Sequence, residues 1–464
     1  MTTPATVLAT AEAQIQPAID RLCDYLRIPA VSCDAGHAPD VARLAERVAA
    51  DLTALGLHAQ VLRLPGAHPC VAASWLHAGP DAPTILIYGH LDLQPVDGGD
   101  GWRTPPHEPT VVGDRLYGRG SSDDMGGWVS HLAAIEAWLK TTGKLPCNIR
   151  LIIEGEEEIG STHLEPYMDA YPEAFQADAM ILTDCENPST EVPGLTVSLR
   201  GVFEVVLKVE ALEADGHSGL WGNMVPDVST ALMQLITRVV DADGRPRVGL
   251  VQHPQSRHAA AAAVPIANET ITRGAHLLPG VTPLPVRGRS AAEWLWLQPA
   301  ITVVSTTLPT PERKKNALRA GATAVLSVRL APDQTPEQML AAMQTELLRD
   351  APQGVKVSAT QERGAGMGWY YEPKGPAFEA VDRAYVAAWG HKPVRVGVGG
   401  SIPFVAIFGN RFGDLPLILN GVMDPESTAH GPNESLHLGV FRKAVLANVH
   451  LYAELAAPGI LPRR

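Results

Sequence analysis

The chain has 464 residues, of which 45% are hydrophobic and 19% are charged, a composition typical of a folded protein rather than a disordered one. Its 50 acidic residues exceed its 37 basic residues, and the net charge of −13 disfavours binding to a nucleic-acid backbone or to an anionic membrane surface. No run of the sequence approaches the ~18 consecutive apolar residues that identify a membrane-spanning helix. At about 100–200 residues per domain, the length predicts two to four domains, or one large domain with an insert.

The cysteines and the first residues bear on the cellular compartment. Residues 1–27 mix polar, charged and apolar side chains and lack the basic start and apolar run of a signal peptide. The five cysteines are scattered, and none forms the Cys-x-x-Cys pair typical of a disulfide framework or a Cys-rich zinc site. We therefore expect a cytoplasmic protein with reduced cysteines.

Helices and strands alternate in the first part of the chain. Apolar residues recur at helical spacing in some segments and form short unbroken runs typical of buried strands in others. This alternation predicts an α/β fold with a mostly parallel central sheet flanked by helices. The predicted helices are 11–26, 40–57 and 126–140, and the predicted strands are 84–88, 148–153 and 179–183.

The pattern changes near Thr196, where strands with alternating burial begin. We expect a catalytic domain built from residues 1–196 and 374–464, with a smaller α+β lid domain, residues 197–373, inserted between its halves. Residues 243–290 are rich in Pro, Arg, Gly and Ala and are predicted as an elaborated loop. The remaining predicted strands are 202–209, 301–305, 322–330 and one near Leu417, and the helices are 225–242, 335–348, 376–389 and 437–455.

Histidine and acidic residues follow three of the predicted strands. His90 and Asp92 follow the first strand, the acidic run 154–158 follows the second, and Asp184 follows the third. Ligands bind at the carboxyl ends of parallel strands, so these side chains are candidates for one site. Taken singly, each is equally typical of a loop histidine beside a solvated carboxylate, or of a solvated charge run.

Two loops add further candidate ligands. Asp123 and Asp124 lie in a Gly-rich segment, where adjacent carboxylates repel each other unless a cation is bound, although a surface Asx turn has the same sequence. His430 precedes the last helix. Carboxylates and imidazoles without a set of thiolates suit Zn²⁺, Mn²⁺ or Co²⁺ in a hydrolytic site. We expect Cys185 to be a small buried residue rather than a ligand.

These segments resemble a known family when they are taken in chain order. The sequence is similar to the M20 family of dinuclear metallopeptidases, especially its dipeptidase branch of carnosinase-like and cytosolic non-specific dipeptidases. The similarity extends over nearly the whole chain. The matching segments are 26–29, 88–92, 116–124, 154–161, Asp184, 215–219, 399–403 and 429–434.

The resemblance implies two divalent metal ions in each subunit, zinc first and manganese or cobalt as alternatives. One ion would be held by His90 and Asp184 and the other by Glu158 and His430, with Asp123 bridging both. The resemblance further implies that Asp92 orients His90 and that Glu157 is the general base.

The resemblance also implies roles for residues of the lid and of the segment after it. His217 would contact the reaction intermediate from the partner subunit of a homodimer formed through the lid. Arg329 would bind the carboxylate of the substrate. Asn316 and Ser401 would lie beside the substrate. Outside this context, His217 and Arg329 are equally typical of a lid-surface histidine and a strand-surface charge.

Three positions depart from the pattern of the dipeptidase branch. Met125 stands where the branch usually has Lys, and Val398 stands where it usually has Glu. Residues 316–319 read Asn-Ala-Leu-Arg where the branch usually reads Asn-x-Ile-Pro. None of these removes an expected metal ligand, so they bear on the substrate more than on the reaction. Residues 243–315 match least.

We therefore expect a two-metal hydrolase that cleaves a peptide or amide bond next to a free carboxylate, as a dipeptidase or short-peptide carboxypeptidase. The alternative within enzymes is an amidohydrolase acting on N-acyl or N-carbamoyl amino acids. A metal-binding scaffold without catalysis is disfavoured because Glu157 is present, and a nucleic-acid-binding or peptide-binding module is disfavoured by the negative charge. The expected partners are a small substrate and a second subunit, without nucleic acid or membrane.

Overall fold

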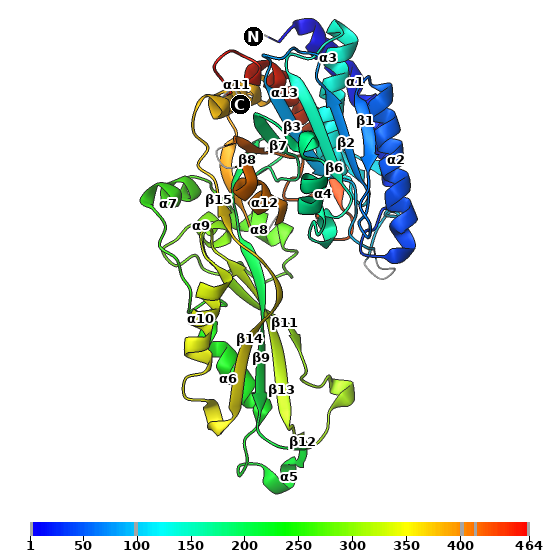
Figure 1. Cartoon of the computed structure of the whole chain (residues 1–464). Coiled ribbons are helices and arrows are strands. Elements are labelled where there is room, and N and C mark those ends of the chain that lie inside the picture. Colours follow the sequence, from blue (N-terminus) through cyan, green and yellow to red (C-terminus); the bar gives the residue numbers. More distant parts are fainter. Residues whose placement is uncertain (1–2, 97–100, 400–402, 413–414, 462–464) are drawn as a thin grey trace.

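The computed structural model describes residues 3–96, 101–399, 403–412 and 415–461 (Figure 1). A larger part contains both termini and most of the helices, and an elongated smaller part extends away from it. Among the described helices, none has the length and apolar character needed to cross a membrane.

A nine-stranded sheet forms the centre of the larger part. Its four middle strands run parallel, whereas β1, β2 and β6 pair antiparallel at one side and β17, β8 and β15 at the other. The predicted α/β class with a mostly parallel sheet is confirmed. The order is β1 (His58–Leu62), β2 (Cys70–Trp75), β6 (Asn148–Glu154), β3 (Thr84–His90), β7 (Ala179–Leu182), β17 (Leu417–Leu419), β8 (Gly194–Leu199) and β15 (Trp369–Tyr370), with β16 (Val394–Val398) parallel to β8.

Helices cover both faces of this sheet, because alternate side chains of each strand point to opposite faces. Ile85 and Ile87 of β3 pack in one hydrophobic cluster, and Leu86 and Tyr88 pack in the other. The first cluster includes α1 (Ala5–Leu26), α2 (Ala38–Ala54), α3 (Met125–Thr142), α11 (Pro376–Trp389) and α13 (Leu438–Leu455); the second includes α4 (Leu164–Ala170) and α12 (Pro403–Phe412).

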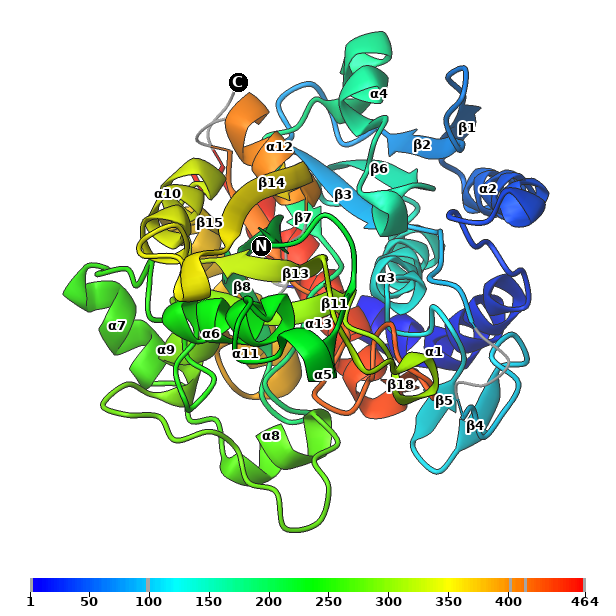
Figure 2. The same cartoon turned by 90° about the horizontal axis from the view of Figure 1, so that it is seen from below.

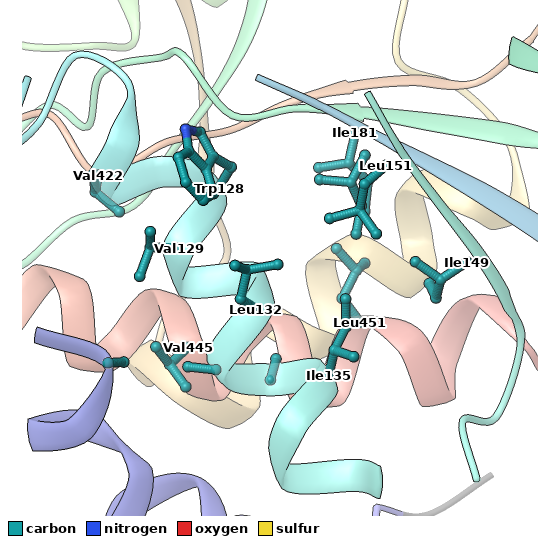
Figure 3. Close-up of a cluster of buried hydrophobic side chains, with 14 of the residues drawn as sticks. Trp128, Val129, Leu132, Ile135, Ile149, Leu151, Ile181, Val422, Val445 and Leu451 are labelled. Atoms are coloured by element: carbon teal, nitrogen blue, oxygen red, sulfur yellow. The ribbon is translucent and has the colours of Figure 1, made fainter. Parts of the chain in front are cut away.

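Helix α3 is the central helix of the first cluster. Its residues from Met125 to Trp138 are all buried, because it lies between the sheet, α1 and α13. Figure 3 shows Leu132 and Ile135 of this helix between the strand residue Leu151 and residues of the last helix. A Cβ atom at Gly127 would lie 2.5 Å from the carbonyl oxygen of Thr183, so only glycine allows the start of α3 to approach the end of β7 this closely.

The smaller part is a four-stranded antiparallel sheet with its own hydrophobic core. Helices α6 (Val228–Val239) and α10 (Pro336–Leu347) pack against this sheet. We call this part the lid. Its strand order is β11 (Ala300–Thr306), β13 (Gly321–Leu330), β9 (Gly201–Glu210) and β14 (Lys356–Gly366). All four strands lie within the predicted insert 197–373, although residues 197–199 and 369–370 at its ends pair within the large sheet.

The prediction of a loop over residues 243–290 was wrong in part. This segment contains α7 (Gln255–Ala262) and α8 (Asn268–Gly274), and α9 (Ala291–Trp296) follows it. Each helix is at most 8 residues long, too short for helical periodicity to stand out between the flanking Pro and Gly residues. Helices α7 and α9 contact each other and β16, and Figure 2 shows them on the side of the molecule opposite to α2 and β1, with α8 apart from them.

Candidate metal centre

Three neighbouring parallel strands bring the first group of candidate ligands together. Strands β6, β3 and β7 are adjacent in the sheet and end at the same edge. His90 ends β3, Asp184 follows β7, and a short 3-10 turn after β6 carries Glu157 and Glu158. This arrangement agrees with the rule that binding sites of parallel sheets lie at the carboxyl ends of the strands.

Asp123 lies between the two candidate metal positions. Its Oδ1 atom is 3.1 Å from Nε2 of His90, and its Oδ2 atom is 3.1 Å from Nε2 of His430. Nε2 of His430 is also 3.2 Å from Oε2 of Glu158. The ligand atoms form two groups, in each of which all atoms lie within 4.8 Å: His90, Glu157 and Asp184 in one, and Asp123, Glu158 and His430 in the other.

The charges of this cluster are strongly coupled. Burial, followed by the charge of Asp123, raises the pKa of Asp184 well above its usual value. Burial also raises the pKa of Glu157. The hydrogen bonds to Asp123 and Glu158 raise the pKa of His430 to about 11. So many carboxylates at one buried site need positive charge, and the oxygen and nitrogen donors fit two divalent cations.

Asp92 and Gln94 contact the candidate ligands and hold them in position. The Asp92 carboxylate lies 3.4 Å from Nδ1 of His90, and it accepts hydrogen bonds from the backbone N–H groups of Glu157 and Glu158, both at 3.1 Å. Gln94 donates a hydrogen bond of 2.7 Å to Oε2 of Glu158. Asp92 thus fixes a histidine and the acidic turn together, and such outer contacts set the orientation of metal ligands.

Glu434 organises the two loops that the sheet does not hold. Its buried carboxylate accepts N–H hydrogen bonds from Gly120, Ser122 and Asp123 at 3.0 to 3.2 Å. Arg119 pairs with it at 2.8 Å and donates to the carbonyl oxygen of His430 at 3.2 Å. Sequence reasoning gave no role to Arg119 or Glu434, although both lie in the segments that carry the resemblance, because a charged residue in a loop is usually solvated.

A cavity of about 160 Å³ opens on the ligands. Its wall includes Asp123, Glu157, Asp184 and His430, together with Cys185, Glu186, Val398 and Met423. Cys185 is also part of the second hydrophobic cluster and is only 2% exposed, in line with the expected buried residue. Glu186 is a site residue that the sequence gave no reason to select.

The residues expected beside the substrate lie in different places. Arg329 lies near the end of β13, paired with Val202 at the start of β9, where the lid joins the large sheet. His217 and Asn316 are exposed at the opposite tip of the lid, where β10 (Gly216–His217) pairs with β12 (Ala317–Leu318) (Figure 1). Strand β9 between these ends has 10 residues and spans ~30 Å. Ser401 lies outside the described residues.

This fold, with paired groups of ligands at the sheet edge beside a cavity, defines a metal-dependent peptidase. The family described as "Peptidase family M20/M25/M40" matches residues 86–455, and the chain belongs to this family.

Relatives with curated names are peptidases of the same kind. The chain is 32% identical over 358 residues, 77% of each sequence, to the cysteinylglycine-S-conjugate dipeptidase of Corynebacterium striatum. It is 27% identical over 460 residues, 95% of each sequence, to the Cys-Gly metallodipeptidase dug1 of Schizosaccharomyces pombe. The solved structure of human carnosine dipeptidase 1 has the same fold, with a TM-score of 0.80 at 22% identity over 98% of this chain and 100% of that one.

We predict that Asp123→Ala loses at least one metal ion per subunit and nearly all activity, because each carboxylate oxygen of Asp123 faces a different ligand group. Elemental analysis of the purified variant measures the metal content. Asp20→Ala, on the exposed side of α1, is the matched control and should keep the wild-type content. A variant with full metal content and normal turnover would contradict the bridging role.

Proposed function

We propose that the protein is a dipeptidase or short-peptide carboxypeptidase that uses two divalent metal ions, with zinc as the native metal. The observation that carries the proposal is the position of Asp123 between two groups of nitrogen and oxygen ligands, with Glu157 on the wall of the adjoining cavity. The names of the relatives, which are dipeptidases for Cys-Gly and related substrates, support the substrate class.

Two bound divalent ions would lower the pKa of a water molecule and polarise the scissile carbonyl. The protein's own groups then have to move the proton. Glu157 reaches the cavity, and burial raises the pKa of its carboxyl group, which makes its carboxylate a stronger base. We infer that Glu157 accepts the proton of the attacking water and passes it to the leaving nitrogen. Asp92 holds the Glu157 backbone in place for this transfer.

Arg329 is the proposed site for the substrate carboxylate. It is half-buried, and burial lowers the pKa of its guanidinium. No acidic side chain pairs with it in the described part of the chain, and the nearby Arg200 adds a second positive charge. A partly buried cation without an anion is costly, and a carboxylate bound by parallel hydrogen bonds would remove that cost.

We further propose that His217 acts on the metal centre of a second subunit in a homodimer formed through the lid. Its location at the far tip of the lid supports this, because that tip is distant from the centre of its own chain. Nδ1 of His217 accepts the N–H of Gly219 at 3.1 Å, which leaves Nε2 protonated as a donor for an oxyanion. The outer strand of the lid sheet, β11, exposes Val303 and Val304, and its free edge suits pairing with another chain.

We also propose a cytoplasmic location. The cysteines of the described chain are all unpaired, and reduced cysteines are typical of that compartment.

A substrate panel tests the reaction. We expect the zinc-loaded protein to hydrolyse free dipeptides faster than N-acetyl or N-carbamoyl amino acids, with elemental analysis of the purified protein reporting the native metal. Faster release of amino acids from the N-acyl compounds would instead make the protein an amidohydrolase with the same metal ligands. Absence of hydrolysis in both series, with metal bound, would contradict the proposed function.

Substitutions of the neighbouring residues Glu157 and Glu158 should differ in their effect on metal content. We predict that Glu157→Gln keeps its metal and loses on the order of 10²–10⁴ in kcat, the usual contribution of a positioned proton-transfer group. Glu158→Gln should lose metal, because its carboxylate belongs to the group with His430. Equal loss of metal in both variants would show that Glu157 is a ligand rather than the base.

A mixed dimer tests the action of His217 in trans. Homodimers of His217→Ala and of Glu157→Gln should both be nearly inactive. In a mixed dimer one site carries both defects and the other carries none, so about half of the wild-type activity should return. Separate affinity tags isolate the mixed species. If no activity returns, His217 acts within its own chain.

A further inference from the structure

A second, larger cavity of about 330 Å³ lies beside the metal centre. Its wall is mostly apolar and comes from the region of α7, α8 and α9 and from the edge of the large sheet. Val264, Ile266 and Ile271 come from the region of α7 and α8, Trp296 ends α9, and Val396 belongs to β16. An apolar cavity of this size suits a hydrophobic side chain.

Three segments of the chain line both cavities. Glu186 lies in the wall of each cavity. Gly397 and Pro425 line the apolar cavity, and their near neighbours in the chain, Val398 and Met423, line the metal cavity. The two cavities are therefore direct neighbours, and Glu186 stands at their junction. A ligand bound over the metals can extend from one cavity into the other past Glu186.

Glu186 is an exposed residue at this junction, and its carboxylate has no cation or hydrogen-bond donor as a partner in the part of the chain that the structure describes. An unpaired carboxylate in the walls of both cavities can bind a positive group of a ligand that occupies them.

We infer that the substrate is a dipeptide with a free α-ammonium group and a large apolar side chain on its N-terminal residue. Glu186 binds the ammonium group, and the apolar cavity receives the side chain. The ammonium group, the side chain and the scissile carbonyl of such a residue are all attached to one Cα atom. They therefore require an anion, an apolar cavity and the metal centre as immediate neighbours, and these three meet at Glu186. This inference rests on the proposed peptidase function.

The first test compares Leu-Gly with 4-methylpentanoyl-glycine, which lacks only the amine. We expect kcat/KM of the wild type to be about 10- to 100-fold higher for Leu-Gly, the usual effect of a hydrogen bond to a charged group. Glu186→Gln should abolish this preference by weakening Leu-Gly alone, whereas Glu186→Asp should keep part of it. Glu165→Gln, on the exposed side of α4, is the matched control.

A binding measurement gives a readout without turnover. In the Glu157→Gln background, calorimetry should detect weaker binding of Leu-Gly when Glu186→Gln is added, with unchanged metal content. An equal loss of affinity for Leu-Gly and for 4-methylpentanoyl-glycine would overturn the assignment of Glu186 to the ammonium group. Loss of metal in Glu186→Gln would overturn it as well, because Glu186 would then belong to the metal centre.

The second test fills the apolar cavity. We expect kcat/KM of the wild type to be about 10-fold or more higher for Leu-Gly than for Ala-Gly. Ala275→Phe adds a ring at the wall of the apolar cavity and should remove this preference. Ala259→Phe, on α7 outside the cavity, should keep that preference. An unchanged preference in Ala275→Phe would overturn the assignment of the cavity. Wild type that cleaves Leu-Gly without these preferences contradicts this inference alone, whereas wild type that cleaves no dipeptide contradicts the proposed function.

Discussion

Repulsion among buried carboxylates is the constraint on which the rest of this structure depends. Asp123, Glu157 and Asp184 converge at one edge of the sheet, where burial raises the pKa of the last two. Proteins tolerate such a cluster only when cations bind there or protons neutralise it. The surrounding residues are arranged accordingly, because Asp92, Gln94 and Glu434 use their hydrogen bonds to hold the ligands in position rather than to neutralise them.

The sequence predicted the strands that carry the ligands because those strands are buried on both faces. Residues such as Ile85, Leu86 and Ile87 form an unbroken apolar run, and a polar residue at its end is easily recognised. The roles of the ligands were inferred from the resemblance to the family. In the structure, the same side chains lie close together in two groups.

Two kinds of feature could not be predicted. The short helices α7 and α9 depend on tertiary contacts with β16 and with each other, and α8, with 7 residues, is also too short to leave clear periodicity in the sequence. The contacts of Arg119 and Glu434 join residues separated by 315 positions, and no local pattern records such a pairing. The apolar cavity escaped detection for the same reason, since its wall is assembled from several distant segments.

The link between Arg119 and Glu434 also has a consequence for the order of events during biosynthesis. The strands that supply His90, Glu158 and Asp184 are complete once less than half of the chain has been made. The backbone N–H groups of the Asp123 loop, however, donate their hydrogen bonds to Glu434, and His430 belongs to the same late segment. Before that segment is made, the nascent chain therefore has only His90, Glu158 and Asp184 of the expected ligands at the sheet edge. The second metal position is complete only after His430 has been made and Glu434 has bonded to the loop of Asp123.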